Sequence, residues 1–204
     1  MKPRVKSLVL FLTGVASFLA VAGCSLPSAQ PDPTRFYLLS AATAATQPVA
    51  GGVAIHLNQI EVASYLKARP LIVRRGDNEI EFREYARWGE ALELGVARVL
   101  REELLARGVA SAVLAPGLRS ATVPFDYELT VRVLACEGGA NQSVLFHAAW
   151  ELATTGAKPA IAAHGDYVAA GLHWDGKSEG SLAAELSRAV TGLAGDIAGG
   201  VAKK

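Results

Sequence analysis

Cysteine is scarce in this chain, and so is methionine. Among 204 residues there are two cysteines, Cys24 and Cys136, and one methionine. Cys24 directly follows an apolar run near the amino terminus. If the Cys24 thiol is covalently modified, Cys136 is the only free thiol left and cannot form an internal disulfide. We interpret Cys136 as a buried, inert thiol, with an intermolecular or reactive role as the alternative.

The chain also lacks an excess of charge of either sign. Its formal net charge is +1, and Lys2, Arg4 and Lys6 all precede the apolar run. The remainder, from Cys24 onward, has 17 basic and 19 acidic side chains. Such a balance gives no electrostatic footprint for nucleic acid. With 51% hydrophobic and 19% charged residues, the composition suits one globular domain with its own core.

No motif argues for catalysis or for a bound metal. A GxSxG motif is absent. The segment GLHWDGKS, residues 171–178, satisfies the phosphate-loop pattern, but its bulky side chains would crowd a phosphate and the following helix is expected only after Gly180. The histidines are dispersed, with no HxH or HxxxH spacing: His56, His147, His164 and His173. We therefore expect no enzyme, no catalytic residue, no metal and no nucleotide; a hydrolase of unnamed type remains a weaker alternative.

The amino-terminal segment is organised like a secretion signal. Residues 1–6, MKPRVK, are basic, and residues 7–22 are apolar. As a helix this apolar stretch spans about 24 Å, short of the roughly 30 Å of a hydrocarbon core, which disfavours a permanent transmembrane helix. It ends in VAGC, residues 21–24, which resembles a bacterial lipobox: a branched apolar residue, two small residues and a cysteine. Small residues let the backbone enter a peptidase groove, and the thiol accepts the lipid.

The lipobox resemblance implies a division of the chain into three parts. Residues 1–23 are a lipoprotein signal peptide, residues 24–33 the lipidated amino terminus with a proline-rich tether, and residues 34–204 a periplasmic domain. Cys24 would carry a covalent diacylglycerol and an N-acyl lipid, enough for a firm anchor, and we expect no other cofactor. Ser25, rather than Asp, follows the cysteine, which implies an outer-membrane anchor facing the periplasm. Ordinary signal cleavage with a chance cysteine, or a retained short anchor, is the alternative.

Apolar periodicity predicts the fold of the remainder. Two amphipathic helices are expected at residues 88–107 and 181–201, the first followed by Gly108 as a C-cap. Hairpins are expected around Gly76-Asp77-Asn78 and between the two alternating strands that end near residue 135 and begin near residue 143. Further strands are expected at residues 35–39, 53–62 (with a bulge or bend), 110–116 and 160–170. We therefore predict a single-domain α+β fold: a mainly antiparallel mixed sheet with two long amphipathic helices packed on it.

One segment, residues 65–104, carries a more specific pattern. It contains a tyrosine-leucine and arginine-proline pair, an IV.R strand, a Gly/Asn hairpin, and a tryptophan that opens a helix ending RVL...L. The residues that match are Tyr65, Leu66, Arg69, Pro70, Ile72, Val73, Arg74, Asn78, Trp88, Glu90, Leu92, Arg98, Val99 and Leu100. With the lipobox and the early RFYLL, the segment resembles the auxiliary lipoproteins of ABC-type transport systems, the paraquat-inducible protein C (PqiC, also YmbA) family. The pattern usually has proline where this chain has Ala91.

The family resemblance implies a docking component rather than a catalyst. Its partner would be an MCE-domain protein of a system that moves lipid, such as phospholipid, between the inner and outer membranes; a homo-oligomer stays open. Residues with a candidate partner-binding role are Tyr65, Leu66, Arg69, Pro70 and Trp88. The alternative for them is a packed corner, with Trp88 in the core at a helix start. The alternative function is a periplasmic lipoprotein that binds a lipid or other hydrophobic ligand and acts alone.

Overall fold

The computed structural model describes residues 30–42, 52–117 and 124–202. The predicted signal peptide and the lipidation site at Cys24 lie outside these ranges, and their assignment stays a prediction. Residues Thr34–Lys204 form one compact unit. Within the described part of this unit, nine strands form one sheet and two α-helices pack on it.

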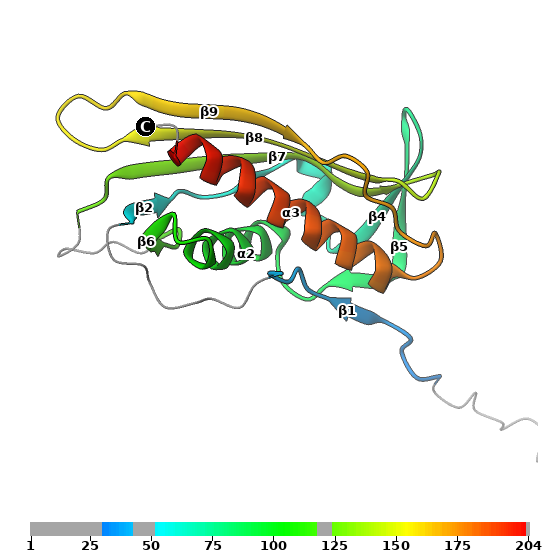
Figure 1. The fold of residues 1–204 in the computed structure, drawn as a ribbon. Coiled ribbons are helices and arrows are strands. Elements are labelled where there is room, and N and C mark those ends of the chain that lie inside the picture. The colour runs from blue at the N-terminus through cyan, green and yellow to red at the C-terminus, as the bar shows by residue number, and fades with distance from the viewer. Residues whose placement is uncertain (1–29, 43–51, 118–123, 203–204) are drawn as a thin grey trace, which may run out of the picture. The chain divides into compact units, whose positions relative to one another are not determined.

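The elements follow one another along the chain as shown in Figure 1. In order they are β1 (Arg35–Tyr37), β2 (Val53–Leu57), β3 (Glu61–Val62), the 3-10 helix η1 (Ser64–Lys67), β4 (Pro70–Gly76), β5 (Glu79–Trp88), α2 (Leu92–Ala106), β6 (Ala110–Leu114), β7 (Tyr127–Gly139), β8 (Val144–Thr154), β9 (Ile161–Val168) and α3 (Glu179–Ala202). The strand order is β1-β5-β4-β7-β2-β6, with β3 and β8 also paired to β7, and β9 paired to β8.

The sheet is mostly parallel by strand pairing, so the prediction of a mainly antiparallel sheet was wrong. Among the pairings of the described residues, five are parallel and three are antiparallel. The antiparallel ones, β4–β5, β7–β8 and β8–β9, join strands that are consecutive in the chain. All pairings between strands far apart in sequence, such as β1–β5 and β2–β7, are parallel. Alternation of apolar residues reveals a half-buried strand but not the direction of a distant partner.

Two hairpins connect strands that are consecutive in the chain, at the turns that the sequence predicted. β4 and β5 are joined at Asp77-Asn78, and β7 and β8 at a turn in which Gln142 has a positive φ of 61°. The expected run 53–62 is divided into β2 and β3, both parallel to β7. Both predicted hairpins and the bend in this run are confirmed.

Helix α2 begins later than the sequence pattern indicated. Trp88 is the last residue of β5, and its amide donates to the carbonyl of Arg69 at 2.8 Å. Ala91 is still extended, with ψ of 137°, and the helix starts at Leu92. The tryptophan therefore ends a strand instead of opening a helix, which corrects that part of the prediction. Gly108, at φ 67°, follows the helix in the left-handed conformation expected of a C-cap.

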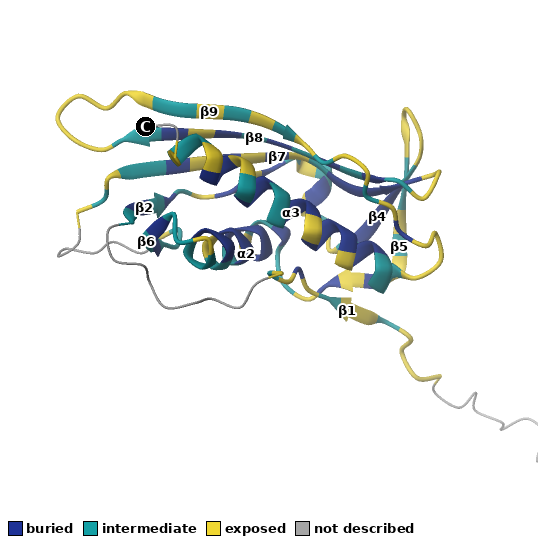
Figure 2. Cartoon of the chain, viewed as in Figure 1, coloured by how far each residue is buried: buried dark blue, intermediate teal, exposed yellow. Residues whose placement is uncertain are grey.

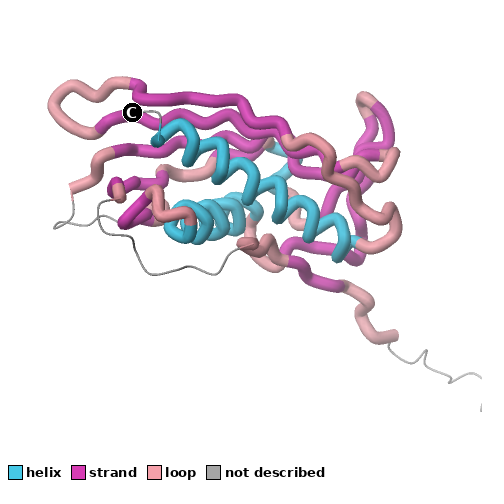
Figure 3. The backbone as a smooth tube through the Cα atoms, viewed as in Figure 1, coloured by secondary structure: helices cyan, strands magenta, loops and turns pink. Residues whose placement is uncertain are grey.

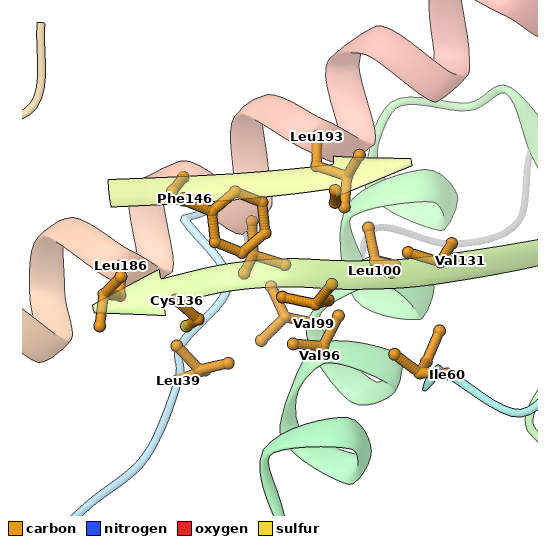
Figure 4. Packing of buried hydrophobic residues seen from close by; sticks show 14 of the residues in the cluster. Leu39, Ile60, Val96, Val99, Leu100, Val131, Cys136, Phe146, Leu186 and Leu193 are labelled. Atoms are coloured by element: carbon orange, nitrogen blue, oxygen red, sulfur yellow. The ribbon is translucent and has the colours of Figure 1, made fainter. Parts of the chain in front are cut away.

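The core lies between the sheet and the two helices (Figures 2 and 3). Figure 4 shows α2 side chains such as Val96 and Leu100 packed with Phe146 of β8 and Leu193 of α3. Each such side chain stabilises the fold by about 1.5–3 kcal/mol when it is fully buried. The predicted apolar stripe of the second helix is completely buried: Leu182, Leu186, Val190, Leu193 and Ile197.

Candidate functional site

Tyr65 and Leu66, two of the predicted partner-binding residues, lie in a tight corner between β3 and β4. Leu66, in η1, is 2% exposed and belongs to the core. Tyr65 is partly buried, and its hydroxyl donates to the carbonyl of Leu134 at 3.3 Å. β3 and β4 both run parallel to β7, at successive positions along it, and η1 lies in the segment that joins them. The packed-corner interpretation therefore describes Leu66, and its side chain cannot touch a partner unless the corner opens.

A buried ion pair lies beside Tyr65. The guanidinium of Arg74 in β4 donates to a carboxylate oxygen of Glu137 in β7 at 2.6 Å, and the Glu137 side chain is fully buried. The other carboxylate oxygen, Oε2, has no hydrogen-bond partner among the described residues. Burying a carboxylate is costly unless it is paired, so Arg74 is what makes this position tolerable for Glu137.

An irregularity in β7 places Glu137 on this side of the sheet. The β7–β8 register shifts between Val133 and Ala135, so the odd-numbered inward pattern that ends at Val133 gives way to an inward Cys136. Glu137 then faces the opposite side, toward Arg74. Sequence reasoning listed Arg74 only as a pattern match and did not consider Glu137. Its signal was a carboxylate that follows the regular alternation of residues 127–133 within the same strand.

Two side chains in this region, Tyr65 and Cys136, have raised pKa values and so lose their protons less readily than usual. Burial, reinforced by the negative charge of Glu137, raises the pKa of Tyr65 from 10.0 to about 12. The same causes raise the pKa of the Cys136 thiol from 9.0 to about 12. A thiol acts as a nucleophile in its thiolate form, so Cys136 is inert at neutral pH. The interpretation of Cys136 as a buried free thiol is confirmed.

The remaining predicted residues meet where β4 begins and β5 ends. Pro70 pairs with Arg87, and the carbonyl of Arg69 accepts the Trp88 amide. Trp88 is 5% exposed and lies in the core, whereas Arg69 is exposed and Pro70 is partly exposed. The structure thus brings Arg69, Pro70 and Trp88 together and leaves Tyr65 with the Arg74–Glu137 pair. Partner binding by any of these residues stays a prediction, with the Trp88 side chain out of reach in this conformation.

An exposed apolar surface that the sequence analysis missed lies next to this point. We call Phe36, Leu38 and Tyr85 the edge patch; they are 64%, 54% and 52% exposed. β1 is an edge strand of the sheet, and Figure 2 shows it largely exposed. Phe36 pairs with Arg87, and paired residues of neighbouring strands project to the same face. Tyr85, two residues before Arg87, shares that face, while Ala86 and Trp88 turn inward.

The end of β1 and the segment after it are hydrogen-bonded to both helices and to the residue that follows β5. We call residues 37–42 the strap. The carbonyl of Tyr37 accepts from the amide of Gly89 at 2.8 Å, and the carbonyl of Leu39 accepts from Arg98 at 2.8 Å. Further on, the strap amides donate to the hydroxyl of Ser187 in α3 at 3.0 Å (from Ser40) and to the buried carboxylate of Glu103 in α2 at 2.7 Å (from Ala42). Tension applied at the amino-terminal end of the domain would therefore reach its core elements directly.

The phosphate-loop match is used for a different purpose in the structure. The Asp175 carboxylate accepts from the backbone amides of Lys177 at 2.8 Å and Ser178 at 2.6 Å, and these bonds lower the pKa of Asp175. Amides that a phosphate would require are thus already occupied by the chain's own carboxylate. α3 begins at Glu179, slightly before the predicted start. The segment forms a turn before α3, in which the Ser178 hydroxyl accepts from the amide of Ser181 at 3.4 Å.

The histidines make pairwise contacts with carboxylates. His147 lies 2.6 Å from Asp166 on the neighbouring strand, and His56 lies 3.4 Å from Glu128. In residues 30–42, 52–117 and 124–202, no group of three or more histidine, cysteine, aspartate or glutamate side chains is arranged to hold a metal ion. In the same ranges, no helix combines the length and the apolar character needed to cross a bilayer.

These features define a class of protein: an α+β domain built on a nine-stranded sheet. Its amino-terminal strand β1 lies at one edge of the sheet, and a buried ion pair joins β4 and β7. The model of the ABC-type transport auxiliary lipoprotein component family matches residues 37–198. The chain therefore belongs to that family, as the sequence pattern indicated.

Solved structures share the fold at low sequence identity. Protein XCC0632 from Xanthomonas campestris, of the DUF330 family, has a TM-score of 0.65 at 16% identity, over 81% of this chain and 93% of that one. The crystal structure of an uncharacterized protein has a TM-score of 0.63 at 16% identity, over 81% and 96% of the two chains. A dodecamer of PelC from Paraburkholderia phytofirmans has a TM-score of 0.40 at 16% identity, over 78% and 92%, too low to carry an inference. No curated protein matches the chain.

Proposed function

We propose that this chain is the outer-membrane-anchored, periplasm-facing docking component of an MCE/ABC-type lipid transport system. The observation that carries the proposal is the family match over residues 37–198 downstream of a lipobox-like VAGC. Membership in a family of transport auxiliary lipoproteins supports a lipid anchor and an accessory role. The outer membrane, the MCE partner and the absence of catalysis are the parts that we propose.

The strap supports a mechanical role for the anchor. A lipid on Cys24 would hold the chain at the membrane through a tether of about 28 Å when extended. Beyond the tether, hydrogen bonds from residues 37–42 to Gly89, Arg98, Ser187 and Glu103 join the chain to β5, α2 and α3. A domain fastened in this way keeps its position while a partner binds or pulls on it, and the anchor raises its effective concentration for a partner at the same membrane.

The interior of the domain favours docking over carriage of a ligand. The space between sheet and helices is filled by a continuous cluster of apolar side chains, of which Figure 4 shows a part. A surface depression on β7, β8 and β9 is lined by four polar side chains, Thr130, Arg132, Glu151 and His164, together with Ala149, Trp150 and Gly165. Stable carriage of an acyl chain would require an apolar cavity of its own.

Two substitutions next to the cleavage site test the proposal. Cys24→Ser should abolish the acyl mass and release the protein from membranes. Ser25→Asp should leave acylation intact but move the protein from outer-membrane to inner-membrane fractions. Native protein that stays in the outer membrane without any acyl mass would contradict the anchor. After crosslinking in cells, the native protein should co-purify with an MCE protein, and its recovery alone would contradict the docking role.

A further inference from the structure

The edge patch is the place where exposed apolar side chains gather on one face of the described surface. Phe36 comes from β1, Leu38 from the start of the strap, and Tyr85 from the neighbouring β5. Leu38 reaches across toward Gly89, which follows β5. Phe82, 45% exposed, also lies on β5, whereas Leu94 in α2 and Ile161 at the start of β9 lie on separate elements.

One arginine lies within the patch and two lie near it. Arg87 is paired with Phe36 and shares the face of the patch. Arg35 pairs with Ala86, and Arg69 precedes Pro70, which pairs with Arg87, so these two arginines belong to the opposite face of their strands. None of these three arginines forms an ion pair with a described residue; Arg87 donates only to the backbone carbonyl of Glu84, at 3.5 Å. Acidic residues close to these arginines in the sequence include Asp32 and Glu84.

The position of the patch in the chain indicates what covers it. Phe36 is the second residue of β1, which directly follows the tether segment. A lipid on Cys24, twelve residues before Phe36, would therefore keep this surface within roughly 40 Å of the membrane. Aromatic side chains with a neighbouring arginine suit the interface of a bilayer, and anionic headgroups attract the arginine.

We infer that the edge patch rests on the surface of the anionic phospholipid bilayer that holds the acylated amino terminus. Phe36, Leu38 and Tyr85 enter the interface between headgroups and acyl chains, and Arg87, on the same face, contacts the phosphates. This contact fixes the orientation of the domain, so that the opposite end of the sheet faces away from the membrane. The inference rests on the proposed anchor at Cys24.

The test uses the full lipidated protein in vesicles of phosphatidylethanolamine and phosphatidylglycerol. Leu38→Cys is labelled with an environment-sensitive fluorophore; native Cys24 is acylated, and native Cys136 is buried with a pKa of about 12, so neither competes for the label. Ile161→Cys, at a position 59% exposed on β9, is the matched control. We expect blue-shifted emission and several-fold stronger quenching by lipid-borne nitroxides at position 38 than at position 161.

A second variant connects the signal to the patch. The double substitution Phe36→Ser and Tyr85→Ser, both at exposed positions, should return the label at position 38 to a water-like emission while acylation and the far-ultraviolet spectrum stay unchanged. Equal exposure to water at positions 38 and 161 in acylated, vesicle-bound protein would overturn this inference alone. Shielding of position 38 only at high protein density, or only with an MCE protein added, would assign the patch to a protein interface and overturn it. A missing acyl mass would overturn both proposals.

Discussion

Arg74 and Glu137 join two parallel strands through a 2.6 Å hydrogen bond between a partly exposed guanidinium and a fully buried carboxylate. The two residues come from β4 and β7, which lie far apart in the chain, and Tyr65 packs beside them. This pair ties the corner that follows β3 to the central strand of the sheet. Its contribution to stability can be separated from that of an ordinary surface pair on the same hairpin.

Arg74→Ala should lower the free energy of unfolding by about 2–3 kcal/mol, because it leaves the Glu137 carboxylate buried without a partner. The matched control is Arg75→Ala, which removes a guanidinium paired with Glu81 at a position where both side chains are substantially exposed. Loss of such a surface pair should cost less than about 1 kcal/mol. Urea unfolding followed by circular dichroism measures both, and equal losses would show that the Arg74 pair is not special.

Tyr65 should make the protein less stable at alkaline pH. Its pKa is raised from 10.0 to about 12 in the folded state, so the unfolded chain loses this proton first. Above about pH 10 the unfolded state then binds fewer protons than the native state, and the free energy of unfolding falls as the pH rises. Because Tyr65 is partly exposed, the effect should stay below about 1 kcal/mol. Tyr65→Phe should show a shallower fall between about pH 10 and pH 12, and an unchanged slope would contradict the assignment.

The carboxyl-terminal helix offers two adjacent glycines with opposite surroundings. A Cβ at Gly200 would overlap the ring of Trp150, whereas a Cβ at Gly199 would meet nothing within 4 Å. Gly199→Ala should therefore stabilise the protein by up to about 1 kcal/mol through helix propensity. Gly200→Ala should destabilise it by about 1–3 kcal/mol, because the buried ring has to shift. Thermal unfolding of both variants is the measurement, and a stabilising Gly200→Ala would show that the helix end can move away from the sheet.

Cys136 should resist alkylation in the native protein. It is 2% exposed, and burial followed by the charge of Glu137 raises the pKa of its thiol to about 12. Iodoacetamide at neutral pH should modify it only as fast as the protein unfolds, so labelling should accelerate many-fold in denaturing urea. Peptide mass spectrometry reads the modification, and rapid labelling of native protein would mean that the β7–β8 region opens locally.

Much of the local structure could be predicted from the sequence. Alternation over residues 127–133 and helical spacing over residues 182–197 gave the correct elements and the correct buried faces, because these patterns depend on contacts within one element. Glycine, aspartate and asparagine marked the hairpins because they are common in turns, although the residue with a positive φ in the β7–β8 turn is Gln142. The family pattern in residues 65–104 was confirmed by a match over most of the chain.

Long-range relationships were decided by the tertiary structure alone. The parallel direction of β1–β5 and β4–β7, the shift in β7 that turns Glu137 toward Arg74, and the meeting of Phe36 with Tyr85 all join segments distant in sequence. Periodicity records which face of an element is buried, but it contains no information on which other element buries it or in which direction that element runs. The sequence by itself thus determined the elements, their inner faces and the family, while the tertiary structure decided the partners of the strands, the corner and the exposed edge.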